Sequence, residues 1–175
     1  MIYKYVAPIV ARLGGAAALA GVSLVGCGRA APATTPADKA AAVETSKCSA
    51  AVDEGRLAPV LTGSAIESVE PLYTRVAMRE SDVQATALHG AWITVRPLPG
   101  MTAELLERSL ECHSARATLG RVDTPTSDPF ALQSALVDIS VKREGDAFRV
   151  GVGAPRTEEA HEILNRAEQL MAASR

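Results

Sequence analysis

The most reactive side chains in this chain of 175 residues belong to three cysteines and three histidines. Zinc sites draw on pairs of such residues spaced as C-x-x-C or H-x-x-x-H, so that both side chains reach one ion. Neither spacing occurs. Cys112 and His113 are adjacent, and neighbours on a helix point about 100° apart, so they do not converge on one metal. His89 and His113 remain as candidate ligands without a complete metal site, and the sequence predicts no cofactor.

Each histidine also has a structural interpretation. The helical phase of His113 places it in the middle of an apolar arc, which predicts a buried side chain with its hydrogen bonds satisfied. His161 falls on the polar face of the last predicted helix and is expected in solvent. His89 precedes Gly90 near the start of a predicted strand, where a structural role is the simpler expectation.

The motifs of common enzyme classes are missing from the sequence. Gly63-Ser64 lacks the strand-turn-helix context of a nucleophile elbow. The run Gly151-Val152-Gly153 continues with Ala154-Pro155, which breaks the glycine pattern of nucleotide-binding loops. No enzymatic activity is therefore predicted.

Two groups of charged residues have both a structural and a functional interpretation. A group of glutamates shares one helical face, the solvated one, where charged residues are expected in any case. A group of arginines lines the predicted open sheet face, either as solvated residues or as a shallow site for an anionic ligand. The glutamates are Glu104, Glu107 and Glu111, and the arginines are Arg75, Arg79 and Arg96.

Composition argues against a nucleic-acid partner. Aromatic residues make up 3% of the chain and the formal net charge is -2. Single-strand binders need several stacking platforms, and phosphate binding needs a basic surface. The chain offers neither, so nucleic acid is not expected as a ligand.

The N-terminal segment has the pattern of a secretory signal. Residues 1–12 contain Lys4 and Arg12 and no acid, and residues 13–26 are uncharged and mostly apolar or small. A membrane-spanning helix needs about 20 predominantly apolar residues. This run is shorter and rich in glycine, which favours export followed by cleavage.

The segment Leu24-Val25-Gly26-Cys27 resembles the lipobox of bacterial lipoproteins, with a branched apolar residue three positions before a cysteine and a small residue just before it. The resemblance implies that residues 1–26 are removed and that the Cys27 thiol receives a diacylglycerol, such as one carrying palmitate. Acyl chains on one cysteine then anchor the protein to the membrane, because each buried methylene contributes about 0.8 kcal/mol. The alternative is an ordinary signal peptide with a coincidental cysteine.

The residue after the lipobox cysteine is Gly28. In Gram-negative lipoproteins resembling this one, Asp at that position often retains the protein at the inner membrane. The resemblance therefore implies a cell-envelope location on the extracytoplasmic side, at the outer membrane facing the periplasm if the host is Gram-negative.

Once Cys27 is acylated, Cys48 and Cys112 remain as an even pair in an oxidising compartment, where a disulfide bond is expected. It would close a loop of about 65 residues and stabilise the fold by about 4 kcal/mol in the chain-entropy description. Free or metal-binding thiols are the alternative.

Residues 27–45 are rich in Ala, Pro and Thr without apolar periodicity, and they predict a tether that holds the folded part clear of the head groups. A short helix over Ala37–Val43 is the alternative, although so short a segment cannot stabilise itself. A single domain is expected over residues 46–175.

Alternating apolar residues predict two ββα units in this domain. The first has strands over residues 72–78 and 91–95, followed by a helix capped by Thr102. The second has strands over residues 135–142 and 147–152, followed by a helix capped by Thr157. The predicted fold is α+β, with the two units forming a four-stranded antiparallel sheet and two helices on one face. Before the first strand, Val60 and Leu61 are predicted to end a short helix that the disulfide bond pins to the helix containing Cys112.

The predicted function is that of a lipid-anchored envelope protein without catalysis, which presents its sheet face or an edge strand to another envelope protein. The alternative is a periplasmic metal-handling or metal-responsive protein that uses His89, His113 and reduced cysteines. The domain also resembles small bacterial lipoproteins without a known activity, through segments such as PLYTRV, FRVGV and VRPLPGMTAELLERSLECHSAR. That resemblance implies no activity.

Overall fold

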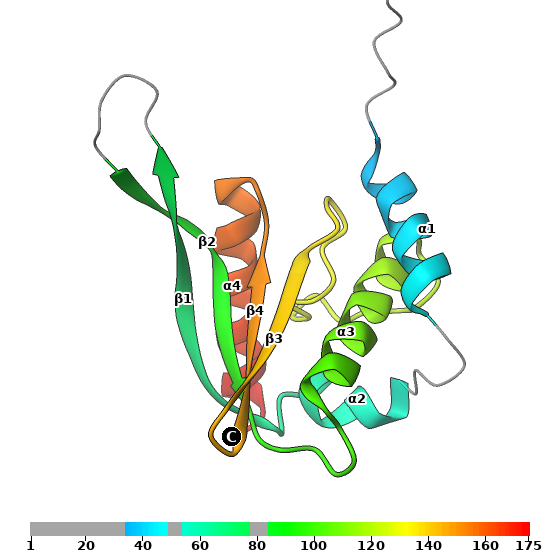
Figure 1. Ribbon diagram of the computed structural model, residues 1–175, viewed down its shortest axis with the longest axis vertical. Helices are drawn as coiled ribbons and strands as arrows, with labels where there is room; N and C mark the ends of the chain where they lie inside the picture. Colours follow the sequence, from blue (N-terminus) through cyan, green and yellow to red (C-terminus); the bar gives the residue numbers. More distant parts are fainter. Residues whose placement is uncertain (1–33, 49–53, 78–83) are drawn as a thin grey trace, which may run out of the picture. The chain divides into compact units, whose positions relative to one another are not determined.

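The computed structural model describes residues 34–48, 54–77 and 84–175. Cys27 and the predicted signal peptide lie outside these residues, as do Met78 and Arg79. The described part contains four helices and one four-stranded antiparallel sheet with the strand order β1-β2-β4-β3 (Figure 1). In chain order the elements are α1 (Pro36–Lys47), α2 (Glu54–Leu61), β1 (Ile66–Ala77), β2 (Gln84–Val95), α3 (Ala103–Thr118), β3 (Asp138–Glu144), β4 (Ala147–Gly153) and α4 (Thr157–Ala173).

The sheet confirms the predicted α+β class and both predicted strand pairs. Its centre is the antiparallel pair β2 and β4, in which Ile93 lies opposite Val150 and Val95 opposite Phe148. Because side chains alternate along a strand, these residues share one face and form the core. Ile93, Val95 and Val150 are fully buried there.

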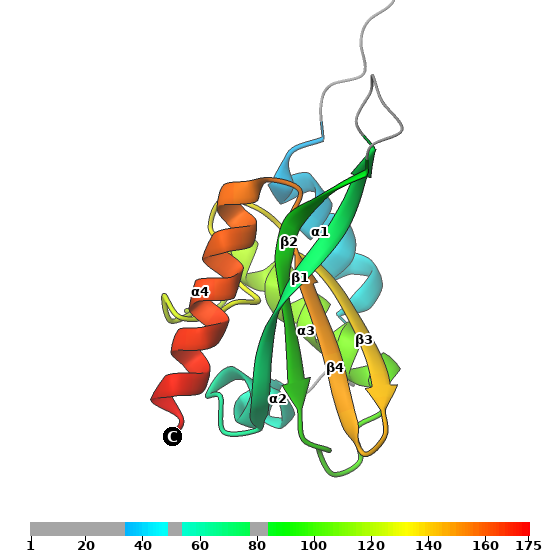
Figure 2. The same cartoon turned by 90° about the vertical axis from the view of Figure 1, so that its left-hand side faces the viewer.

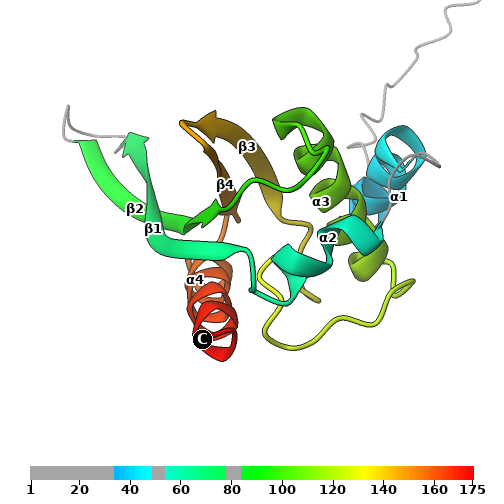
Figure 3. The same cartoon turned by 90° about the horizontal axis from the view of Figure 1, so that it is seen from below.

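The two predicted helices are α3 and α4, and each packs against strands of the other ββα unit. α4 follows β4 but lies across β2 and β1, with Ile163, Ala167 and Leu170 buried along its inner stripe (Figure 2). α3 follows β2 but lies beside β3 (Figure 3). Among the described residues, no helix covers the opposite face of the sheet, which is the open face from here on.

α1 corrects the predicted tether, because Pro36–Lys47 is helical rather than extended. Thr35 caps its start in a capping box with Asp38, and Pro36 occupies the first turn. Only Ala40 is buried along the helix. α1 therefore depends on its attachments to α3, and these supply what a short isolated helix lacks.

The attachment of α1 to α3 combines one covalent bond with ion pairs. Cys48 and Cys112 form a disulfide bond with an S–S distance of 2.01 Å and Cα atoms 5.2 Å apart. It therefore joins the end of α1, rather than α2, to α3. α2 does end at Leu61, as predicted. Two ion pairs link the same helices and the end of α3: Lys47 with Glu111 at 2.8 Å, and Glu44 with Arg121 at 2.6 Å.

Two predictions about helix α3 and helix α4 need correction. Of the three glutamates expected in solvent, only Glu104 is exposed, because α1 and β3 pack against the face that carries Glu107 and Glu111. The cap of α4 is Arg156 instead of Thr157, which is the first helical residue. Thr102 does cap α3, and its side chain accepts a hydrogen bond from the Leu105 amide.

Candidate functional site

The open face of the sheet carries two aromatic rings that lie over glycines. Gly151 and Gly153 alternate along β4 with Val150 and Val152 of the core, so they face the other side of the sheet, although they are themselves buried. A Cβ added at Gly151 would lie 2.7 Å from Cζ3 of Trp92, and one added at Gly153 would lie 2.6 Å from Nε2 of His89. The missing side chains make room for the two rings, which remain partly exposed on the surface.

A β-bulge directs His89 onto this face. The pairing of β1 with β2 shifts between Leu72, opposite Gly90, and Tyr73, opposite Leu88, so His89 has no partner in β1. Gly90 has φ 152°, and a Cβ there would lie 1.9 Å from the Val152 carbonyl oxygen, so only glycine fits. Bulges often redirect a side chain in this way. Sequence analysis missed the bulge, although a glycine inside a strand is its usual signal.

Arg149 completes the cluster on β4. Its guanidinium lies 4.9 Å from the centre of the Trp92 ring, a cation–π contact. It also forms ion pairs with Glu70 of β1 at 3.2 Å and with Glu144 of β3 at 3.3 Å. Exposed pairs of this kind contribute about 0–1 kcal/mol each. Arg149 can therefore exchange them at low cost for another carboxylate.

A hollow of about 120 Å³ lies beside the two glycines. Small-molecule sites usually measure about 300–1,000 Å³. The hollow has room for one side chain of a partner rather than for a metabolite. It is lined by Leu72, His89, Asp138, Ile139, Ser140, Gly151 and Gly153.

The two sheet edges are poorer docking sites than the open face. The Val141 amide at the β3 edge donates a hydrogen bond of 2.7 Å to Glu107 of α3, so that edge is partly covered. The β1 edge contains Pro71, which has no amide hydrogen, and two register shifts. Proline and bulges both obstruct the addition of another strand. Of the two predicted docking modes, the geometry favours the face.

His113 is a buried structural histidine. It is 5% exposed, and its Nε2 lies 2.7 Å from Oδ2 of Asp128. The other carboxylate oxygen of Asp128 accepts a hydrogen bond from the Phe130 amide, so the pair fastens the loop after α3. Sequence analysis did not single out Asp128. His113 Nδ1 is buried without a hydrogen-bond partner among the described residues.

The candidate metal ligands are not brought together. His89 lies on the open face, whereas His113 is in the interior and is held by Asp128. Cys48 and Cys112 are joined in a disulfide bond and offer no free thiol. Within the described ranges, no group of three or more His, Cys, Asp or Glu residues is placed to hold a metal ion.

The arginines proposed for an anionic ligand are also separated. The Arg96 guanidinium donates a hydrogen bond to the Ser64 carbonyl, next to the start of β1. Arg75 is near the other end of the same strand, on the order of 30 Å away at about 3.3 Å per residue. Their distance along the strand rules out a shared site for these two residues. His161, on the surface of α4, is exposed as predicted.

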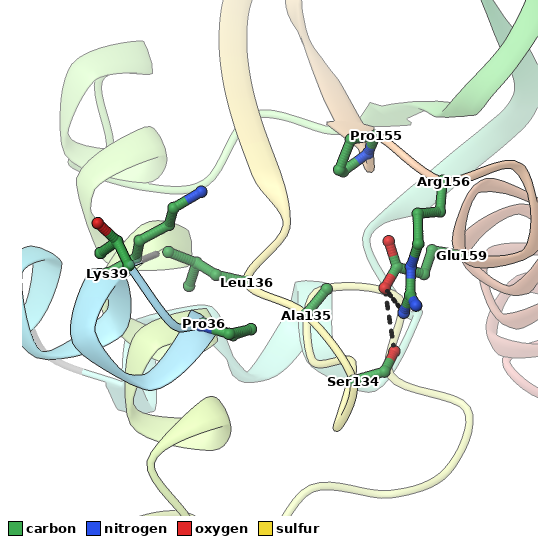
Figure 4. Close-up of a pocket in the computed structure, with 9 residues that line it drawn as sticks. Pro36, Lys39, Ser134, Ala135, Leu136, Pro155, Arg156 and Glu159 are labelled. Atoms are coloured by element: carbon green, nitrogen blue, oxygen red, sulfur yellow. Dashed lines mark hydrogen bonds and ion pairs between the residues drawn. The ribbon is translucent and has the colours of Figure 1, made fainter. Parts of the chain in front are cut away.

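A larger cavity of about 260 Å³ lies between the start of α1 and the start of α4 (Figure 4). Glu159, 3% exposed, forms part of its wall. Glu159 Oε1 accepts hydrogen bonds from the Arg156 guanidinium and, at 3.3 Å, from the Ser134 hydroxyl. The Arg156 hydrogen bond lowers the pKa of Glu159 below its usual value, and this effect outweighs the opposing effect of burial.

In the part of the chain that the structure describes, no helix has the length and apolar character needed to cross a bilayer. No protein-family model, curated protein or solved structure matches the chain.

Proposed function

We propose that the protein is a lipid-anchored, non-catalytic module of the cell envelope that docks onto another envelope protein through the open face of its sheet. The observation that carries the docking surface is a cluster on the open face, which no described element covers. In it, Trp92 and His89 lie over the glycines of β4, and Arg149 lies against the Trp92 ring. Tryptophan and arginine are the residues most enriched at the energetic centres of protein interfaces.

The chemistry of the open face suits a protein partner. The Trp92 ring has little conformational freedom to lose on binding. The Arg149 cation already links three strands, because it forms ion pairs with Glu70 of β1 and Glu144 of β3. The hollow beside them can receive one apolar side chain of the partner. These features resemble a small interface centre with a polar rim.

The anchor rests on the lipobox. Leu24, Gly26 and Cys27 match its pattern, so residues 1–26 are taken as a signal peptide and Cys27 as the lipidated first residue of the mature chain. Membrane attachment would keep the open face available to partners in the same envelope layer. The metal-handling alternative required reduced thiols, and no observation in the described residues favours it.

The anchor is tested by cell fractionation and intact-mass measurement. We expect the wild-type protein in the membrane fraction, with residues 1–26 removed and the mass of a diacylglycerol, with or without a further acyl chain, on Cys27. The Cys27→Ala variant should have the mass of the full chain, with residues 1–26 still attached and no lipid. A wild-type product that retains its first 26 residues without added lipid would contradict the anchor.

The docking surface is tested by crosslinking in intact envelopes with the lipidated protein. A double variant, Trp92→Ala with Arg149→Ala, should reduce the yield of the specific crosslinked species by at least about 30-fold, as expected for the loss of an interface centre. Glu168→Ala, an exposed change on α4, is the matched control and should leave the yield unchanged. Equal yields from both variants would refute docking through the open face.

A further inference from the structure

The described fold begins close to the proposed lipid anchor. Thr34 is the first described residue, seven positions after Cys27. Seven residues span at most about 25 Å, whatever their conformation. With α1 folded, the tether is too short to hold the domain far from the bilayer. The start of α1 must therefore stay near the lipid head groups.

The cavity of about 260 Å³ lies at this end of α1. Three segments that are distant in the sequence build its wall, and Figure 4 shows their side chains around one space. The start of α1 contributes Thr34, Pro36 and Lys39, the loop before β3 contributes Ser134, Ala135 and Leu136, and the start of α4 contributes Pro155, Arg156 and Glu159.

The charges around the cavity favour an anion. Among the residues that line the cavity, Lys39 and Arg156 are two cations against the single carboxylate of Glu159, so the lining carries one positive charge in excess. Glu158, which acts on Arg156 from outside the lining, reduces this excess. Lys39 is exposed, and its side-chain ammonium forms no hydrogen bond or ion pair with any described residue. Arg156 remains 62% exposed while its guanidinium is held in place by Glu159.

The remaining wall is apolar and small. Pro36, Leu136 and Pro155 offer surface for a short carbon skeleton such as glycerol. The cavity is below the range of about 300–1,000 Å³ typical of sites for drug-sized ligands, so it suits one compact group. A phosphate ester of glycerol combines the required negative charge with that size.

We infer that this cavity binds the phosphate head group of a membrane phospholipid. The inference rests on the proposed lipid anchor, because the anchor keeps the cavity next to the bilayer. Tethering raises the effective concentration of head groups at the cavity, so even a weak site is occupied. Binding there fixes the start of α1 and the start of α4 toward the membrane and limits how the domain can turn on its tether.

The test is native mass spectrometry of the purified lipidated protein incubated with one of two lipids. The probes are dioleoylphosphatidylglycerol and digalactosyldiacylglycerol, which has no phosphate. We expect one co-bound phosphatidylglycerol per protein, at a yield about tenfold above that of the galactolipid, as for a hydrogen bond to a charged group. Lys39→Ala should lower the phosphatidylglycerol yield by about tenfold.

Lys142→Ala is the matched control, because Lys142 is also exposed but does not line this cavity. It should leave the yield unchanged. Equal binding of both lipids, or equal yields from Lys39→Ala and wild type, would overturn the inference. Binding of glycerol 3-phosphate by a protein that takes up no phosphatidylglycerol would assign the site to a soluble phosphate and also overturn the inference.

The same spectra separate this inference from the proposed anchor. If Cys27 carries its acyl mass but no phospholipid co-binds, the cavity inference fails and the anchor stands. If Cys27 carries no acyl mass, the anchor itself fails.

Discussion

The two faces of the sheet use the same strands in different ways. On the covered face, Ile93 and Val150 are fully buried beneath the helices, and hydrophobic packing explains them. On the open face, the next residues along the strands are Trp92 and Arg149, which contact each other, glycine backbone and exposed glutamates. The covered face thus accounts for the stability of the domain. The open face has features that stability does not require, so we assign the contact with a partner to it.

The largest expected effect comes from the covered face. Ile93→Ala removes a fully buried side chain at the centre of the sheet and should lower the free energy of unfolding by about 2–5 kcal/mol. Thr94→Ala, its neighbour on the open face, should change that free energy by less than about 0.5 kcal/mol. Urea unfolding measures both. If both variants lowered the free energy of unfolding equally, the open face would also be covered, and the contrast between the two faces would be wrong.

Loss of the disulfide bond should weaken the covered side without altering the open face. Replacing Cys48 and Cys112 together by serine removes the covalent attachment of α1 and should lower stability by about 2–4 kcal/mol. Trp92 is the only tryptophan in the chain, so native fluorescence reports on the open face alone. Its emission maximum should stay unchanged in the variant. A shift would show that the two faces are coupled.

A smaller effect should follow from filling a glycine on the open face. Gly153→Ala places a Cβ against the His89 ring and should cost about 1–3 kcal/mol through overpacking. His89→Ala in the same chain removes the ring and should restore part of that loss. Thermal unfolding of the two single variants and the double variant measures the coupling. Strictly additive losses would place His89 away from Gly153.

The smallest predicted effect concerns pH. The pKa of Glu159 lies below its usual value of 4.5, so the charged carboxylate stabilises the folded state at neutral pH. That contribution should disappear as the pH falls from about 5 through the folded-state pKa. Glu159→Gln should be less stable than wild type at neutral pH, and the difference should narrow in acid. Urea unfolding at several pH values measures this difference in stability. A difference that stays constant with pH would contradict the prediction.

Much of the fold could be predicted from local patterns. The alternation in β3 and β4 and the cap at Thr102 are short-range signals, and the hairpin and the cap are confirmed, although β3 begins at Asp138 instead of Ala135. The helix α1 was only the alternative to the predicted tether, over Ala37–Val43, because the segment has no apolar periodicity and only Ala40 is buried along it. Its stability comes from contacts with α3, which are distant in the sequence.

The sequence predicts an open sheet face lined by arginines, but it does not predict the cluster of Trp92, His89 and Arg149. His89 was taken as a residue near a strand start, because strand periodicity does not show an inserted bulge. Trp92 lies over Gly151 because β2 pairs with β4. This pairing joins residues that are distant in the sequence, so no local pattern predicts it. Arg96 donates a hydrogen bond to the Ser64 carbonyl, a contact that strand alternation does not show.

The most direct test is site-specific photocrosslinking in living cells. A photoreactive amino acid replaces Ser140, whose hydroxyl oxygen would lie 2.8 Å from a Cβ added at Gly151 on the open face, or Glu168, which is exposed on α4. Docking through the open face predicts a discrete crosslinked species from position 140 and none from position 168, and Trp92→Ala should abolish the species. Crosslinks of equal yield from both positions, or none from position 140, would contradict it.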